Sequence, residues 1–206
     1  MSDDQPMLAV AKKPRTSRGE KTRAKLLEAA RREFGEKGFY EAGIVGITQR
    51  AGVALGSFYT YFNSKEEVYR ALVEHMGVVT RRWQSGHIAA APDRLSAERI
   101  GVEAFIEFMR GHQDLYRIVM EAQFVAPDAY RAYYEVFAED YRRNLASAGK
   151  RGQVRPGADE ERAWALIGMN VFLGLKYGVW NTDASPGEIA EAVSDLIEHG
   201  LSPDPK

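Results

Sequence analysis

The side chains best suited to recognising a polar partner stand together in one short segment. Four hydroxyl groups lie within five residues, after a glycine that leaves room for close approach, namely Gly56, Ser57, Tyr59, Thr60 and Tyr61. Hydroxyl groups can hydrogen-bond to phosphates or to base edges, and a threonine methyl can contact a thymine methyl. The segment therefore predicts a nucleic-acid surface, with plain packing of the tyrosines as the alternative.

Three short helices are expected to position this segment. The apolar period of residues 18–37 predicts a first helix, and Gly38 follows it as a stop. A second helix over 44–51 is joined by a turn at Gly52 to a third over 55–62. This layout is that of a helix-turn-helix, which places its second helix in the DNA major groove.

Residues 22–68 also resemble the DNA-binding domain of the TetR family of bacterial transcriptional regulators. The matching residues are Arg23, Ala29, Ala30, Phe34, Gly38, Tyr40, Ile47, Arg50, Ala51, Gly52, Val53, Gly56, Phe58, Tyr59, Tyr61, Phe62, Ser64, Lys65 and Glu66. The resemblance covers about the first third of the chain. It implies phosphate contacts from Tyr59 and Lys65, a ligand cavity between the middle helices and a dimer formed by the last two helices.

The other DNA contacts follow from position along the predicted helices. Arg18 and Arg23 near the start of the first helix are expected to contact phosphates. Leu55 begins the third helix, where the family often has Lys or Arg. The expected DNA-binding residues are thus Arg18, Arg23, Leu55, Gly56, Ser57, Tyr59, Thr60, Tyr61 and Lys65.

The second predicted helix departs from the family pattern at two glycines. Gly43 stands where Ser or Thr commonly caps the helix, which costs a few tenths of a kcal/mol. Gly46 replaces a usual acidic residue, which adds a helix penalty of roughly 1 kcal/mol relative to Ala. The sequence therefore predicts a loosely held second helix.

The charge of the chain is unevenly distributed. Residues 11–65 carry twelve Lys and Arg against five Asp and Glu, so that this part has a net charge of +7. The whole chain has a net charge of −1, which leaves −8 for the remainder. A basic N-terminal part followed by an acidic remainder indicates that the N-terminal part binds a polyanion.

Composition and length limit the other possibilities. The 206 residues contain no cysteine, which excludes disulfides, thiolate zinc sites and a cysteine nucleophile. The N-terminus has no apolar run of signal-peptide length, and the apolar stretch 164–180 is interrupted by Lys176. We expect a cytoplasmic protein that does not contact a membrane.

The rest of the chain is expected to be helical. Apolar spacing predicts helices over 64–83, 93–110, 114–124, 127–148, 159–181 and 185–200. The predicted fold class is all-α, with an N-terminal helix-turn-helix domain and a C-terminal ligand-binding and dimerisation domain. The expected parts are a disordered basic arm (1–17), a DNA-binding domain (18–65) and an effector and dimer domain (66–206).

No enzyme or metal chemistry is expected in the body. His75, His87, His112 and His199 are scattered without metal-ligand spacing. The sequence has no phosphate-binding glycine loop and no nucleophile elbow. We therefore predict no catalytic residue, no metal and no cofactor.

The body does hold many aromatic side chains on its helices. Most should be ordinary core, but several are expected to line the family's ligand cavity: Phe105, Phe108, Phe137, Trp164 and Phe172. Asn170 is the polar member of an apolar run, and it could bind ligand, pair across a dimer or hold a water. These residues predict a mainly apolar or aromatic small-molecule effector.

Two glycines one helical turn apart are candidates for a dimer contact. Gly174 and Gly178 would let another helix approach closely, with packing inside the monomer as the alternative. Val193 and Ile197 belong to the apolar face of the last helix. By resemblance these four residues are expected at the interface of a homodimer.

Together these expectations describe a dimer that binds operator DNA. The resemblance implies a repressor whose effector releases it from double-stranded DNA. An activator, or a regulator that needs no ligand, is the alternative on the same fold. An enzyme would require a catalytic cluster, and the sequence offers none.

Overall fold

The computed structural model describes residues 16–200, and every regular element in that range is helical. The all-α fold class is therefore confirmed. The arm expected at residues 1–17 lies almost wholly outside the described residues. Within them, no helix combines the length and apolarity that crossing a membrane requires.

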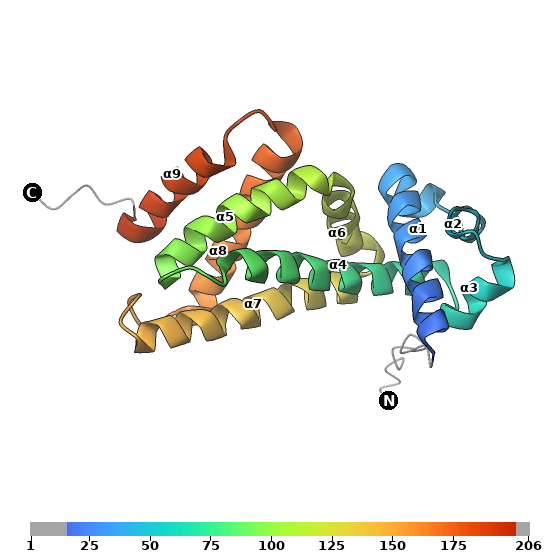
Figure 1. Ribbon diagram of the computed structural model, residues 1–206, viewed down its shortest axis with the longest axis horizontal. Helices are drawn as coiled ribbons and strands as arrows, with labels where there is room; N and C mark the ends of the chain where they lie inside the picture. The colour runs from blue at the N-terminus through green and yellow to red at the C-terminus, as the bar shows by residue number, and fades with distance from the viewer. Residues whose placement is uncertain (1–15, 201–206) are drawn as a thin grey trace, which may run out of the picture.

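Three helices form a head at one end of the molecule (Figure 1). They are α1 (Ser17–Glu41), α2 (Ile44–Ala51) and α3 (Leu55–Tyr61). The regular part of α1 stops at Gly38, whose φ of 76° and ψ of 172° lie outside the helical region. Gly52 ends α2 in the left-handed conformation with a φ of 65°. Both glycines thus make the turns that the sequence predicts.

The remaining helices build an elongated body (Figure 1). They are α4 (Lys65–Ile88), α5 (Arg94–Gly111), α6 (Gln113–Val125), α7 (Pro127–Lys150), α8 (Asp159–Leu173), the π-helical segment Gly174–Trp180 and α9 (Pro186–His199). The first of these, α4, runs from the head along the body. Its N-cap is Ser64, whose side chain accepts a hydrogen bond from the backbone N–H of Glu67, as expected.

One apolar core continues from the head into the body. It includes Phe34 and Phe58 in the head, Tyr69 on α4, and Ile118 and Phe137 in the body. A smaller cluster joins α5 to α9 through Val102, Ile106, Ala190 and Val193. Because the first core is continuous, a change of packing in the body can reach the head.

The structure differs from the predicted elements in two places. α4 continues to Ile88, not to residue 83, because Trp83 donates to the Ala104 carbonyl at 3.0 Å and His87 packs on its ring. The helix predicted over 159–181 changes to π-helix at Gly174. There Arg110 donates to the Tyr177 carbonyl at 3.1 Å, so that a side chain satisfies a backbone acceptor of the wider turn.

Candidate nucleic-acid interface and ligand cavity

The third helix is held by two phenylalanines and presents polar groups outward. Phe58 and Phe62 are fully buried, as the spacing of four residues predicts. Gly56 and Thr60 are exposed, and Tyr59 is 48% exposed. This face is therefore free to meet another molecule.

The other predicted DNA-binding residues of the head differ in exposure. Leu55 and Arg18 are exposed, and Ser57 is half-buried. Tyr61 is half-buried and packs against the core, which supports a partly structural role for this side chain. Arg23 lies with its guanidinium 5.4 Å from the centre of the Phe62 ring. That contact fastens the start of α1 to the end of α3.

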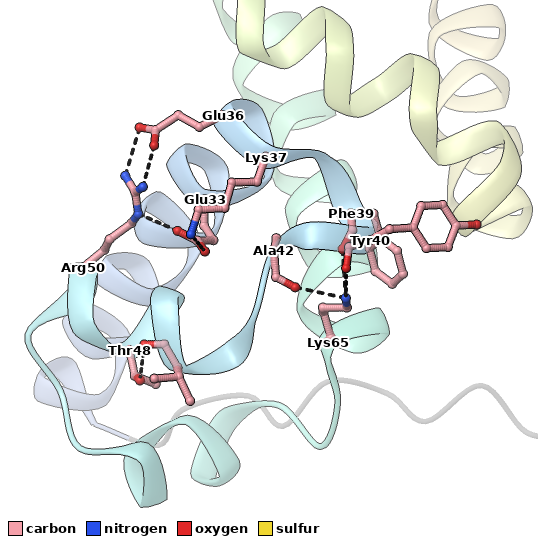
Figure 2. A network of polar contacts seen from close by, with 10 residues as sticks. Glu33, Glu36, Lys37, Phe39, Tyr40, Ala42, Thr48, Arg50 and Lys65 are labelled. Atoms are coloured by element: carbon pink, nitrogen blue, oxygen red, sulfur yellow. Dashed lines mark hydrogen bonds and ion pairs between the residues drawn. The ribbon is translucent and has the colours of Figure 1, made fainter.

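Lys65 has an intramolecular role that the sequence did not indicate. Its ammonium donates to the carbonyls of Phe39 at 2.8 Å, Ala42 at 3.0 Å and Tyr40 at 3.4 Å (Figure 2). It also lies 4.4 Å from the centre of the Phe39 ring. These contacts engage all three ammonium hydrogens, so a phosphate contact from Lys65 would require one of them to be given up.

A buried carboxylate ties the first two helices together. Glu33 is 1% exposed, and its oxygens accept from Lys37 at 2.7 Å and from Arg50 at 2.6 Å (Figure 2). Burial raises the pKa of Glu33, but the hydrogen bonds from Lys37 and Arg50 outweigh it and leave the pKa lowered. Arg50 also donates to Glu36 at 2.9 Å. One arginine of α2 thus bridges two carboxylates of α1.

Gly46 explains how α2 reaches this carboxylate. A Cβ at Gly46 would overlap the carboxyl group of Glu33. The absence of a side chain therefore allows the close approach of α2 to α1. The expectation of a loosely held second helix is corrected, because Arg50 and Glu33 anchor it in a way that helix propensity does not reveal.

α6 connects the body to the head through polar contacts. Asp114 pairs with Arg31, and Arg117 donates to the Gly35 carbonyl at 3.0 Å. Glu121 accepts from the Phe39 backbone N–H at 3.0 Å, next to the break in α1. These residues lie on one face of α6, and they fix it to the last turns of α1.

The opposite face of α6 lines an apolar cavity inside the body. The cavity volume is about 40 Å³, and the wall is formed by Gln84, Phe105, Met109, Leu115, Tyr116, Val119, Met120, Tyr133, Tyr134, Phe137, Tyr141, Ile167, Asn170 and Val171. A space of this size holds a few atoms. A larger ligand would have to displace side chains of the wall.

The structure brings together only part of the predicted ligand set. Phe105, Phe137 and Asn170 line the cavity. Phe108 is buried elsewhere, with its ring centre 4.1 Å from that of His112. Four tyrosines of the wall are absent from the predicted ligand residues, because periodicity could not distinguish them from core: Tyr116, Tyr133, Tyr134 and Tyr141.

Trp164 and Phe172 face an outer groove. This groove has a volume of about 560 Å³ and lies along α7 and α8. Phe172 is 68% exposed there. The groove and the cavity share the side chains of Met120, Tyr134, Ile167 and Val171. These four residues therefore form the partition between the cavity and the outside.

The predicted dimer residues pack inside the monomer. A Cβ on Gly174 would come within 2.6 Å of the Phe105 ring, and one on Gly178 within 2.6 Å of the Met109 Cβ. Val193 is buried in the cluster with α5, and Ile197 packs against it. The placement of Gly174 and Gly178 at an interface is corrected, because both notches are filled by α5 of the same chain.

No metal site is formed among residues 16–200, where no three His, Asp or Glu side chains are suitably grouped. Three of the histidines contact a residue four positions earlier in the chain. His87 and His112 contact the carbonyls of Trp83 and Phe108, and His199 contacts Asp195. These contacts give the histidines structural partners.

Comparisons with known proteins agree with this geometry. Residues 26–72 match the model described as bacterial regulatory proteins, tetR family. An uncharacterised HTH-type transcriptional regulator of Bacillus subtilis, YdgC, is 27% identical over 91% of this chain and 96% of its own. The HTH-type transcriptional activator FasR of Mycolicibacterium smegmatis is 31% identical over 57% of this chain and 53% of its own.

A solved structure shares the whole fold. The regulator FadR of Bacillus subtilis, solved with stearoyl-CoA, superposes with a TM-score of 0.74 at 17% identity. The alignment covers 87% of this chain and 99% of FadR. All three relatives are described as regulators or activators of transcription. By this match, residues 26–72 form an N-terminal domain of the tetR family of bacterial regulatory proteins, and the other helices complete a fold that solved regulators share.

Proposed function

We propose that this protein is a cytoplasmic dimeric repressor that leaves its operator when an apolar small molecule fills the body cavity. The observation that carries the proposal is the position of α6. Leu115 and Val119 on one face of this helix line the cavity, and Arg117 and Glu121 on the other hold the head. The proposal assigns DNA binding to residues 18–65 and effector binding and dimerisation to residues 66–206.

The cavity wall supports an apolar or aromatic effector. The wall is mostly aromatic and aliphatic, with Asn170 and Gln84 as its side-chain amides. Pockets of this composition bind hydrocarbon surface and use few polar groups for orientation. The stearoyl-CoA bound by FadR carries such a hydrocarbon chain, which supports the same class of ligand here.

The coupling to DNA follows from the attachment of α6. A ligand larger than about 40 Å³ must push the walls apart, and α6 contributes four of the lining side chains. Displacement of α6 would pull on the Glu121 contact with Phe39 and on the Arg31 pair with Asp114. In a dimer this changes the separation of the two α3 helices, which binding in successive major grooves would fix at roughly 34–36 Å. The effector acts only by its differential affinity for the two states.

A test of the effector uses compounds of graded polarity. Alkylbenzenes, alkanols and stearoyl-CoA are added to the protein–operator complex, and release of labelled DNA is followed by anisotropy. We expect release by mainly hydrocarbon compounds. Phe137→Leu, which reshapes the wall, should shift the releasing concentration about tenfold and leave DNA affinity unchanged.

The control for this test is Phe124→Leu, because Phe124 is exposed and lies outside the cavity wall. It should respond as the wild type does. Release by strongly polar anions alone, or by no compound, would contradict the apolar effector. Release that is identical in both variants would place the effector site elsewhere.

The dimer surface is proposed to lie on the outer faces of α8 and α9. Ala165 and Phe172 are exposed on α8, as are Ala192 and Leu196 on α9. Gly168 lies between the two α8 residues, and no atom stands within 4 Å of where its Cβ would be. This open notch allows close approach of a second copy, which Gly174 and Gly178 cannot do.

Phe172→Arg is therefore expected to dissociate the dimer. The side chain is exposed in the monomer, so the arginine should not disturb folding. At an interface its charge would be buried without a partner, which should weaken dimerisation by about a hundredfold or more. Sedimentation velocity measures the change, and Phe124→Arg, at another exposed phenylalanine, is the matched control. A Phe172→Arg protein that remains dimeric would rule out this surface.

An activator on the same fold is the second candidate, because one relative is described as an activator. The two differ in the direction of regulation and share the DNA-binding head. A reporter behind the operator, compared in cells with and without the protein, distinguishes them. Higher expression in cells without the protein would support repression, and lower expression would support activation.

A further inference from the structure

One residue of the cavity wall carries a buried hydrogen-bond acceptor that no residue within 16–200 satisfies. Asn170 lines the cavity and is 6% exposed. Its side-chain oxygen is buried and has no hydrogen-bond partner among the described residues. A buried polar atom in this state costs free energy that a suitable ligand can recover.

The orientation of the Asn170 amide is fixed by its neighbours. The Nδ2 group donates to the Leu166 carbonyl at 3.0 Å and to the Tyr141 hydroxyl at 3.4 Å. Rotation of the amide by 180° would turn its oxygen against the Leu166 carbonyl, which is repulsive. The part of the amide that remains without a partner is therefore the oxygen, which can only accept a hydrogen bond.

The partner hydroxyl is itself held in a buried polar chain. Tyr141 interacts with the Glu98 carboxylate, which pairs with Arg94. The Arg94 guanidinium also lies 5.5 Å from the centre of the Tyr141 ring. Burial, followed by the nearby Glu98 charge, raises the pKa of Tyr141, so its hydroxyl remains protonated. A protonated hydroxyl that donates to Glu98 is free to accept from Asn170, which keeps the amide in the orientation described.

We infer that the effector of this protein carries an O–H or N–H donor on an otherwise hydrocarbon body, and that the donor hydrogen-bonds to the Asn170 side-chain oxygen. This inference deepens the proposed function and rests on it. The rest of the wall is mostly apolar, so one donor group is enough to orient the ligand. A pure hydrocarbon or an ether of the same shape would leave the Asn170 oxygen buried and unpaired.

The test compares three para-alkyl series with chains from methyl to octyl: phenols, the corresponding anisoles and the alkylbenzenes. The anisoles keep the ring and the oxygen but cannot donate a hydrogen bond. Calorimetry on the full-length protein should show the phenols binding about tenfold more tightly than anisoles of equal chain length. In Asn170→Leu the phenols and anisoles should bind within about twofold of each other.

The matched control is Asn181→Leu, because Asn181 is exposed and lies outside the cavity wall. It should keep the preference of the wild type for phenols. Tyr141→Phe, which removes one partner of the Asn170 amide, should weaken the preference but not reverse it. Should Asn170→Leu fail to fold, the comparison of phenols with anisoles on the wild-type protein still decides whether the ligand needs a hydrogen-bond donor.

The outcomes separate this inference from the proposed function. Equal binding of all three series would overturn the donor requirement and leave the apolar effector standing. A preference for phenols that persists in Asn170→Leu would place the acceptor on another residue. Binding of none of the compounds would overturn both the inference and the apolar effector.

Discussion

Gly56→Glu should abolish operator binding while leaving the fold intact. Gly56 is exposed on α3, and no atom lies within 4 Å of where its Cβ would stand, so a side chain fits there. A carboxylate on this face would meet the phosphates, and such like-charge contacts cost several kcal/mol, which corresponds to about a hundredfold or more in affinity. Fluorescence anisotropy with a labelled operator measures the loss.

The matched control for this prediction is Gly86→Glu. Gly86 is also an exposed helical glycine with open space around it, but it lies near the end of α4 in the body. The two variants have the same charge, so a general electrostatic effect would weaken both equally. Equal loss in both variants, or no loss in Gly56→Glu, would show that the outer face of α3 does not contact DNA.

The second large effect concerns the glycines of the C-terminal helices. Gly178→Ala should lower the free energy of unfolding by about 1–3 kcal/mol, because its Cβ would press on the Met109 side chain and on the Ile106 carbonyl. Gly86→Ala in α4, which lies outside the proposed dimer surface, should instead be neutral or stabilising by up to about 1 kcal/mol, because its flank is open and Ala favours helix. The unfolding midpoints of the two variants are compared by thermal unfolding at one fixed protein concentration.

The Gly178→Ala variant also tests where the dimer forms. A Gly178→Ala protein that is as stable as the wild type but sediments as a monomer would show that this glycine lies at the dimer interface. A destabilised protein that remains dimeric is the result we expect. For a domain of this length each kcal/mol corresponds to roughly 2–4 °C in Tm.

The head could be predicted closely because its signals are local. Gly52 requires a left-handed backbone, and the Phe58 and Phe62 pair lies one helical turn apart. Such features depend only on residues close together in the sequence. For this reason the bounds predicted for α2, 44–51, agree with the structure. The Lys65 contacts were missed because they join residues more than twenty positions apart.

The body could be predicted as helices but not as a site. Phe105 and Phe108 lie on the same turn of α5, yet only Phe105 reaches the cavity. Both rings are buried, and which of them reaches the cavity depends on where α4, α6 and α8 pack. Periodicity carries no such information. The same holds for Gly174 and Gly178, since a notch for a neighbouring helix looks identical whether the neighbour belongs to the same chain or to another.

Selection of DNA sequences by the purified full-length protein tests the central claim most directly. Random duplexes are bound and recovered through several rounds, with Gly56→Glu carried in parallel. We predict enrichment of an inverted repeat whose half-sites lie about one helical turn apart, and binding that falls steeply with salt. The variant should enrich nothing. Failure of the wild-type protein to enrich any sequence, or enrichment of the same repeat by Gly56→Glu, would contradict the account.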